Sequence, residues 1–176
     1  IRPTVDGLSA EGLPYTGFLY AGLMIAPDGT PKVLEYNCRF GDPETQPIML
    51  RLKSDLVSHC LAAMEGRLDK ETAEWDPRAA LGVVLAAGGY PASYDKGDPI
   101  SGLPQDEPWD LKVFHAGTEE RDGQIVTAGG RVLCATALGN SVAEAQNRAY
   151  ALTRKINWRG VYYRTDIGYR AVAREH

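Results

Sequence analysis

The chain has 176 residues, of which 44% are hydrophobic and 24% charged, and these proportions are ordinary for a globular protein that buries its own core. Its formal net charge of -4 argues against broad nucleic-acid binding, which requires a basic surface. The longest apolar run, residues 79–87, is about half the length that crosses a bilayer, and no segment has the pattern of a signal peptide. We therefore expect a cytoplasmic protein that binds neither nucleic acid nor membrane.

The three cysteines, Cys38, Cys60 and Cys134, lie far apart in apolar surroundings. Because their number is odd, we expect reduced thiols and neither disulfides nor a zinc site. The first residues show neither an initiator methionine nor a helix start. The sequence thus predicts that the chain begins inside a longer protein.

Two strands joined by a turn are predicted near the start of the chain. Residues 15–25 and 32–37 are rich in aromatic and apolar residues, and the turn-forming residues 27–30 lie between them. This order predicts an antiparallel hairpin. Residues 40–44 then interrupt the second strand.

A helical segment is predicted after the hairpin. Asp42 suits its N-cap and Pro43 its first helical position, Ser54 could restart it as an internal cap, and Gly66 ends it. Apolar residues that recur every four positions predict one buried face. These residues are Ile48, Leu52, Leu56, Cys60 and Met64.

A polar stretch, residues 69–78, predicts a domain boundary, so we place one domain at residues 1–75 and another at 76–176. In the second domain, residues 79–87 predict a strand buried on both faces, and residues 141–144 form a capping box that opens a helix. The predicted class is α+β. Further strands are predicted at residues 111–116, 124–127 and 131–138, with a short helix in the tail.

Three polar residues alternate along the second strand of the hairpin: Glu35, Asn37 and Arg39. Side chains two apart on a strand share one face, and at about 3.3 Å per residue Glu35 and Asn37 lie roughly 7 Å apart. Both could then reach one Mg²⁺ ion or a close pair, since that ion prefers oxygen ligands, and the fork of Arg39 suits a phosphate. The same alternation is also normal for the solvent-exposed face of an edge strand, so the pattern alone leaves both interpretations open.

Asp42 also has two interpretations, and they can coexist. It could simply cap the following helix. A helix N-terminus also offers N–H groups to a carboxylate or phosphate, and Asp42 is the nearest acid in the loop that could bind the ammonium group of an amino acid. By contrast, His59 and His115 have no acidic or cysteine partner at a useful spacing and are interpreted as structural.

Several stretches resemble the glycinamide ribonucleotide synthetase family, which belongs to the ATP-grasp superfamily. Residues 15–23 and 35–46 are similar to the closing segment of the ATP-grasp domain in that family. The fold that the resemblance implies is the C-terminal half of an ATP-grasp lobe, followed by a small antiparallel β domain with a packed helix, similar to a hybrid-motif domain. The likeness continues through residues 82–84, 88–91, 115–118, 129–133 and 166–168.

The resemblance also implies roles for the polar residues. Glu35 and Asn37 would be ligands of Mg²⁺ or Mn²⁺, Asn37 and Arg39 would bind ATP, and Arg39 and Asp42 would be catalytic. The implied substrates are ATP, glycine and 5-phosphoribosylamine. The implied reaction belongs to de novo purine biosynthesis and forms glycyl phosphate before the amine displaces phosphate.

Two departures limit the resemblance. Leu23 stands where many other ATP-grasp enzymes carry an acidic metal ligand, which leaves the geometry of a second metal open and argues against the carboxylases. The sequence contains no lysine-bearing glycine-rich loop and no phosphoribosylamine-binding domain, so we expect the N-terminal domains of the same enzyme as partners and no activity from this chain alone. The alternatives are another ATP-grasp ligase or carboxylase, and a non-enzymatic hybrid-motif interaction module.

Overall fold

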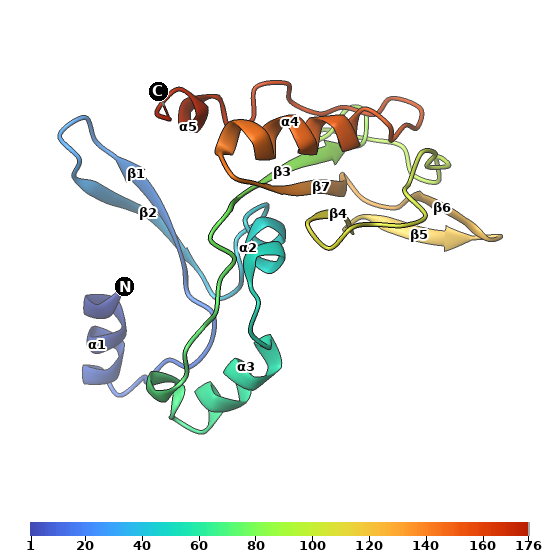
Figure 1. Ribbon diagram of the computed structural model, residues 1–176. Coiled ribbons are helices and arrows are strands. Elements are labelled where there is room, and N and C mark those ends of the chain that lie inside the picture. The colour runs from blue at the N-terminus through green and yellow to red at the C-terminus, as the bar shows by residue number, and fades with distance from the viewer. Residues whose placement is uncertain (176) are drawn as a thin grey trace. The chain divides into compact units, whose positions relative to one another are not determined.

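The computed structural model describes residues 1–175, and the chain forms two compact units (Figure 1). The first unit contains Ile1–Thr45 and Leu52–Glu74, and the second contains Gln46–Arg51 and Trp75–His176. The chain therefore enters the second unit briefly, returns to the first, and then completes the second. Both units contain helices and antiparallel strands, which confirms the predicted α+β class.

The first unit contains the predicted antiparallel hairpin, formed by β1 (Tyr20–Ile25) and β2 (Pro31–Asn37). The turn is closed by the Asp28 carboxylate, which accepts the backbone N–H of Thr30 at 2.9 Å. Tyr20 pairs with Asn37, and the register shifts by a bulge after Gly22. The hairpin thus places the start of β1 beside the end of β2.

The residues before the hairpin differ from expectation. Helix α1 (Arg2–Ala10) occupies the start of the chain, so the expectation that no helix starts there is wrong. Pro3 lies in the first turn, where a missing N–H leaves no helical hydrogen bond unmade. The chain then bends as the Tyr15 hydroxyl donates to the Phe18 carbonyl at 2.6 Å, and the first strand begins later than predicted.

Two helices, α2 (Thr45–Arg51) and α3 (Leu56–Met64), replace the single predicted segment. Asp42 is not the N-cap of α2, and that expectation is corrected. The Asp42–Pro43 peptide bond is cis, residues 42–44 form a turn, and α2 begins at Thr45, whose N–H donates to the Gly41 carbonyl at 3.0 Å. The turn therefore separates Asp42 from the helix that it was expected to cap.

Helix α3 is capped by Asp55 and not by Ser54. The Asp55 carboxylate accepts the backbone N–H groups of Val57 at 3.0 Å and Ser58 at 3.3 Å. Asp55 therefore satisfies two of the N–H groups that a helix start leaves without partners. After α3 the first unit ends in a short 3-10 helix, η1 (Leu68–Lys70).

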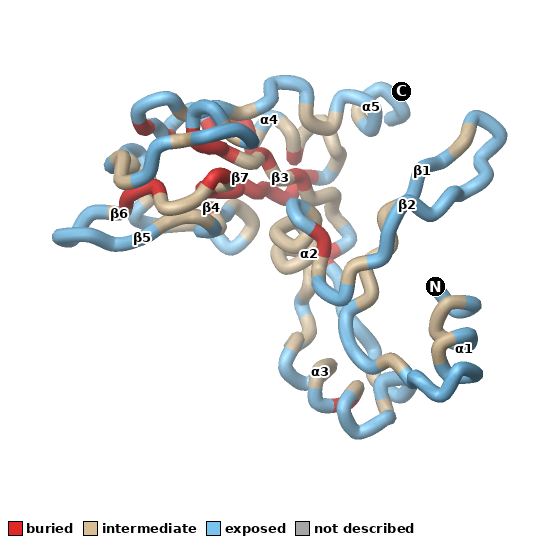
Figure 2. Tube along the Cα trace, turned by 180° about the vertical axis from the view of Figure 1, so that it is seen from behind, coloured by how far each residue is buried: buried red, intermediate tan, exposed pale blue. Residues whose placement is uncertain are grey.

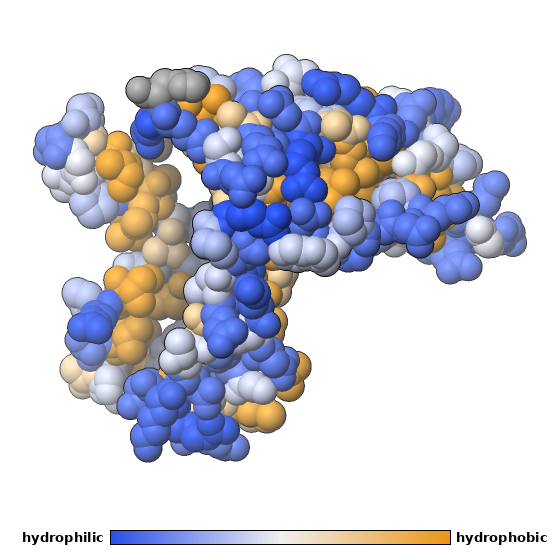
Figure 3. All heavy atoms as spheres, in the orientation of Figure 1, coloured by the Kyte–Doolittle hydropathy of each residue, from blue (hydrophilic) through white to orange (hydrophobic). Residues whose placement is uncertain are grey.

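Much of the apolar surface of the first unit is exposed. In α3 only Ala62 is buried. Of the predicted face, Leu56 and Cys60 are half-buried and Met64 is 79% exposed, so the predicted buried face is wrong for this part of the chain. Periodicity shows which face of a helix is apolar, but not whether anything covers it. Hydrophobic side chains also lie on the surface of the hairpin (Figure 3), and the large exposed ones are Leu23, Met24, Ile25, Val33, Leu34 and Tyr36.

The second unit is built on a three-stranded antiparallel sheet in the order β3, β7, β4. A separate two-stranded sheet pairs β5 with β6. The predicted strands are confirmed, and β5 was not predicted. The bounds are β3 (Ala79–Ala86), β4 (Leu111–His115), β5 (Thr118–Arg121), β6 (Gln124–Thr127) and β7 (Arg131–Gly139).

Helix α4 (Val142–Thr153) lies across one face of β3 and β7 (Figure 1). The predicted capping box is present, since Ser141 Oγ accepts the Glu144 N–H at 3.0 Å. The Glu144 carboxylate in turn accepts the N–H of Asn140, one residue before the cap, at 2.7 Å. The tail ends in the short helix α5 (Tyr169–Val172).

The core of the second unit lies between the sheet and α4 (Figure 2). Strand β7 is the one buried on both faces; β3 alternates between buried and half-buried residues, which corrects the prediction for residues 79–87. On the face away from α4, Pro47 of α2 lies against Gly82 of β3, where an added Cβ would be 3.3 Å from the proline ring. No helix within residues 1–175 has the length and apolar character needed to span a membrane.

Candidate functional site

The candidate site begins on one face of the hairpin. Tyr20 pairs with Asn37 and Gly22 with Glu35, and paired residues point to the same side of a sheet, so Glu35 and Asn37 share a face as predicted. Gly22 has no side chain on that face, and an added Cβ would lie 3.0 Å from Glu35 Cγ. The glycine therefore leaves room for the Glu35 side chain, which is exposed.

Asn37 and Arg39 are in contact at the end of β2. Arg39 Nη2 donates to Asn37 Oδ1 at 3.3 Å, and Arg39 Nη1 donates to the Phe40 carbonyl at 2.8 Å. The amide nitrogen of Asn37 is buried and has no hydrogen-bond partner among the described residues. The strand end thus joins a carboxylate, an amide oxygen and a guanidinium on one polar surface.

The loop after β2 carries Asp42, whose side chain is exposed. The ring of Phe40 stacks against that of Phe18, with 4.1 Å between the centroids, and fixes the start of the loop. The structure therefore places Asp42 two residues beyond an anchored aromatic side chain, in the same unit as the other predicted site residues.

Sequence reasoning missed a contact between Tyr20 and Glu44. The Tyr20 hydroxyl donates to Glu44 Oε1 at 3.1 Å. This hydrogen bond to Glu44 raises the pKa of Tyr20; the charge of Glu35 raises it further, and that of Arg39 lowers it. Both Glu35 and Arg39 therefore lie within electrostatic reach of the hydroxyl. The pairing of Tyr20 with Asn37 across the predicted hairpin could have placed the tyrosine on this face, but not its bond to Glu44.

Other polar residues, outside the hairpin and its loop, have local partners. His59 Nε2 lies 2.7 Å from Ser54 Oγ, and His115 Nδ1 lies 3.1 Å from Thr118 Oγ1. In the tail, Arg164 and Asp166 form a two-bond ion pair at 2.8 and 2.9 Å, and this pair lowers the pKa of Asp166.

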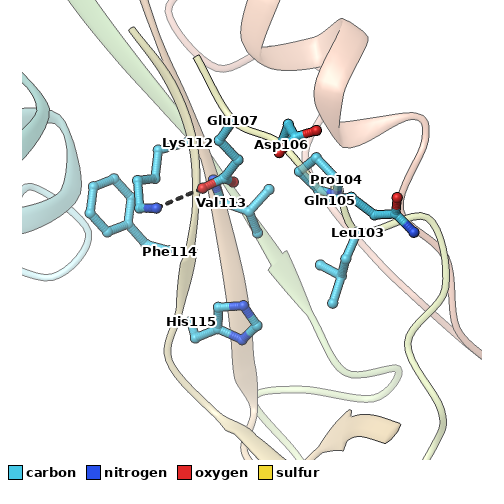
Figure 4. A pocket seen from close by; sticks show the side chains of 9 residues that line it. All are labelled: Leu103, Pro104, Gln105, Asp106, Glu107, Lys112, Val113, Phe114 and His115. Atoms are coloured by element: carbon cyan, nitrogen blue, oxygen red, sulfur yellow. Dashed lines mark hydrogen bonds and ion pairs between the residues drawn. The ribbon is translucent and has the colours of Figure 1, made fainter. Parts of the chain in front are cut away.

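A hollow of about 460 Å³ on the second unit lies along the outer edge of β4 (Figure 4). Glu107 projects into it, where its carboxylate binds Lys112 Nζ at 2.6 Å and accepts the backbone N–H of Val113 at 2.6 Å. The carboxylate is therefore occupied by protein donors, and it covers part of an otherwise open strand edge. Within residues 1–175 no group of three or more His, Cys, Asp or Glu side chains could hold a metal ion, at this hollow or elsewhere.

The chain matches two family models. Residues 80–170, just over half of the chain, match the C domain of phosphoribosylglycinamide synthetase, and residues 1–45 match the ATP-grasp (A) domain of the same enzyme. A phosphoribosylamine–glycine ligase of Vibrio vulnificus is 71% identical over 175 residues, and one of Salmonella typhimurium is 67% identical over 176 residues. The chain spans 41% of the length of each of these relatives, although 99% of the chain is covered.

Solved structures agree with the family models. A phosphoribosylamine–glycine ligase from Thermotoga maritima is similar with a TM-score of 0.79 and 42% identity, over 92% of this chain and 39% of that one. A pyruvate carboxylase from Rhizobium etli is similar with a TM-score of 0.59 at 17% identity, over 100% of this chain and 19% of that one, which shows a shared fold only. The two family models and the ligase relatives agree along the chain, and the chain belongs to the phosphoribosylglycinamide synthetase family.

Proposed function

We propose that this chain forms part of an ATP-dependent ligase that joins glycine to 5-phosphoribosylamine and so makes glycinamide ribonucleotide in cytoplasmic purine biosynthesis. One observation carries the proposal: the polar face of Glu35, Asn37 and Arg39 lies in a chain that is 71% identical to a relative named phosphoribosylamine–glycine ligase. In this proposal a glycine carboxylate oxygen bonds to the γ-phosphorus of ATP as ADP leaves. The amine nitrogen then bonds to the glycyl carbonyl carbon as phosphate leaves, and its proton passes to solvent.

Glu35 and Asn37 would hold a divalent cation, Mg²⁺ or Mn²⁺, in the proposed site. The donor set fits such an ion, because a carboxylate and an amide oxygen are hard ligands on one face of β2. Two ligands leave the rest of the shell to water and nucleotide phosphates. The bound ion would neutralise phosphate charge.

Arg39 and Asp42 would bind the reacting groups. Arg39 has a planar fork that suits the phosphates of ATP, and its contact with Asn37 keeps it beside the proposed cation ligands. Asp42 would accept the ammonium group of glycine. Its exposed side chain, two residues beyond Phe40 in the same unit as Arg39, supports this role.

The domain assignment follows the same proposal. Residues 1–75 would close an ATP-grasp domain, and residues 76–176 would form a small C-terminal domain similar to a hybrid motif. The remaining 59% of the relatives' length would supply the other partners of the site, including the surfaces that bind ATP and phosphoribosylamine.

The proposal is tested in the intact protein that contains this chain. ADP formation should require ATP, glycine and phosphoribosylamine together, and bicarbonate should not replace glycine. Glu35→Gln should remove activity at low Mg²⁺ without loss of fold, while Glu120→Gln, on exposed strand β5, serves as the matched control. ADP formation that depends on bicarbonate and not on glycine would favour a carboxylase and contradict the proposal.

Asp42→Asn tests the ammonium role separately. A charge-assisted hydrogen bond is worth roughly 1.5–3 kcal/mol, so the KM for glycine should rise about ten- to hundred-fold. The KM for ATP should change much less. Unchanged glycine kinetics would remove Asp42 from the proposed site.

A further inference from the structure

Tyr20 and Glu44 form a contact that the proposed roles leave unused. Tyr20 begins β1 and pairs with Asn37, so its side chain lies on the same face as Glu35 and Asn37. Glu44 ends the turn that carries Asp42. The 3.1 Å hydrogen bond between them therefore connects the polar strand face to the far end of the loop.

Gly41 lies directly against this pair and is buried. An added Cβ would lie 2.4 Å from Glu44 Oε2 and 2.7 Å from Tyr20 Cε2, so only glycine fits without moving one of the partners. The Gly41 carbonyl accepts both the N–H of Thr45 at 3.0 Å and its hydroxyl at 2.6 Å. The loop is thus held on both sides of Asp42.

The pair retains a polar atom that folding does not satisfy. Glu44 Oε2 is buried and has no hydrogen-bond partner among the described residues. A buried carboxylate oxygen without a protein partner costs stability, and each such atom calls for an explanation.

We propose that Tyr20 and Glu44 are positioning residues for the amino-acid substrate. Their hydrogen bond holds the loop of residues 40–44 against the start of β1, so that Asp42 keeps a fixed place relative to Arg39. Neither residue needs to touch the reacting atoms, since both act through the loop. The inference rests on the proposed function and adds to it the device that sets the affinity for glycine.

Steady-state kinetics of the intact protein test this role with Tyr20→Phe, which removes the hydroxyl and keeps the ring against Gly41. The KM for glycine should rise about ten-fold, the cost of losing one hydrogen bond to a charged group. The kcat at saturating glycine and the KM for ATP should stay within about two-fold. Tyr162→Phe is the matched control, because it removes the hydroxyl of a tyrosine of the second unit that is 58% exposed, and should leave all three constants unchanged.

A second variant separates positioning from charge. Glu44→Gln keeps an acceptor for the Tyr20 hydroxyl, so the KM for glycine should change by less than about three-fold. Adding Tyr20→Phe to Glu44→Leu should cause no further loss, because the two residues act through one bond.

Each result decides a separate point. A normal KM for glycine in Tyr20→Phe, or an equal decline of kcat, both KM values and thermal stability, would overturn the positioning role. A ten-fold effect of Glu44→Gln with a normal Tyr20→Phe would also overturn it, in favour of direct charge recognition. Absence of glycine-dependent ADP formation in the unmodified protein would instead overturn the proposed function, before any variant is made.

Discussion

The two units of the chain bury their apolar side chains to very different extents. In the second unit, Leu85 and Leu133 lie in the core cluster and are fully buried, and Leu138 of β7 is fully buried as well. In the first, Gly41 and Ala62 are the only buried residues among those described. The second unit therefore contains a core of the kind that stabilises a domain, and the first does not.

The first unit nevertheless forms well-defined elements. Its hairpin has a closed turn and a regular register, although a two-stranded hairpin alone is marginally stable in water. Between Phe18 and α3 lies a hollow of about 300 Å³, lined by apolar side chains that include Leu56 and Met64. Local sequence patterns thus specify strands and helices in both units, while only the second unit supplies both surfaces of its core.

A leucine-to-alanine substitution in each unit should show the largest contrast in the free energy of unfolding. Leu138→Ala removes a fully buried side chain of β7 and should lower the free energy of unfolding by about 2–5 kcal/mol. Leu34→Ala removes a β2 side chain that is 65% exposed and should change it by no more than about 0.5 kcal/mol. Urea unfolding of the 176-residue chain, followed by circular dichroism, measures both.

Similar losses from the two leucine variants would contradict the comparison. They would mean that Leu34 is buried in solution, by association or by rearrangement of the hairpin. Sedimentation of the unmodified chain distinguishes these two explanations.

Features that depend on neighbouring residues could be predicted from the sequence, and contacts between distant residues could not. The hairpin, the strands of the second sheet and the capping box at Ser141 were predicted because each depends on neighbouring residues. The shared face of Glu35 and Asn37 followed from strand alternation alone. The Tyr20–Glu44 bond was missed because it depends on how the loop folds back around Gly41.

A second comparison concerns ion pairs. In the second unit the Asp110 carboxylate accepts Arg148 Nη2 at 3.0 Å and Arg78 Nη1 at 3.1 Å, and it is largely buried. Asp110→Asn leaves Arg148 without its charge partner, while Arg78 keeps its ion pair with Asp76, and should cost about 1–3 kcal/mol at neutral pH. Asp166→Asn, in a pair with Arg164 that is more than half exposed, should have no measurable effect.

The contribution of Asp110 to the stability of the fold should decrease as the pH falls. Hydrogen bonds from Arg148, and then from Arg78, lower the pKa of Asp110 in the folded state. Its contribution is therefore complete above the unfolded pKa of about 3.9 and is lost as the pH falls through the lower folded value. Urea titrations from pH 7 to pH 3 measure the free energy of unfolding of the unmodified chain and of Asp110→Asn. The difference between the two free energies should become smaller below about pH 4. A difference that stays constant over this range would exclude the ion pair as its source.

A smaller effect on the free energy of unfolding is expected from a substitution at the start of α4. Ser141→Ala removes the side chain that accepts the Glu144 N–H and should lower the free energy of unfolding by about 1 kcal/mol. Because α4 packs on β3 and β7, the whole second unit should show the loss. Ser141→Asn, which keeps a capping oxygen, is the control and should retain most of the stability.

The smallest effect is expected at Asp55, the cap of α3, because this helix buries only Ala62. Asp55→Asn should leave unfolding by urea unchanged, since asparagine caps about as well as aspartate and little of the second unit depends on α3.

The strength of the Asp55 cap should depend on pH. Hydrogen bonds from the Ser58 hydroxyl and the Val57 N–H lower the pKa of Asp55, so its capping is complete above the ordinary pKa and weakens as the pH falls through the lower folded value. The protection factors of the amides in the first turn of α3, which correct for the pH dependence of intrinsic exchange, should therefore fall in acid in the unmodified chain but not in Asp55→Asn, whose amide does not titrate. An equal fall in both chains would place its cause outside the cap, and a loss of global stability in Asp55→Asn would show that α3 supports more of the fold than its burial indicates.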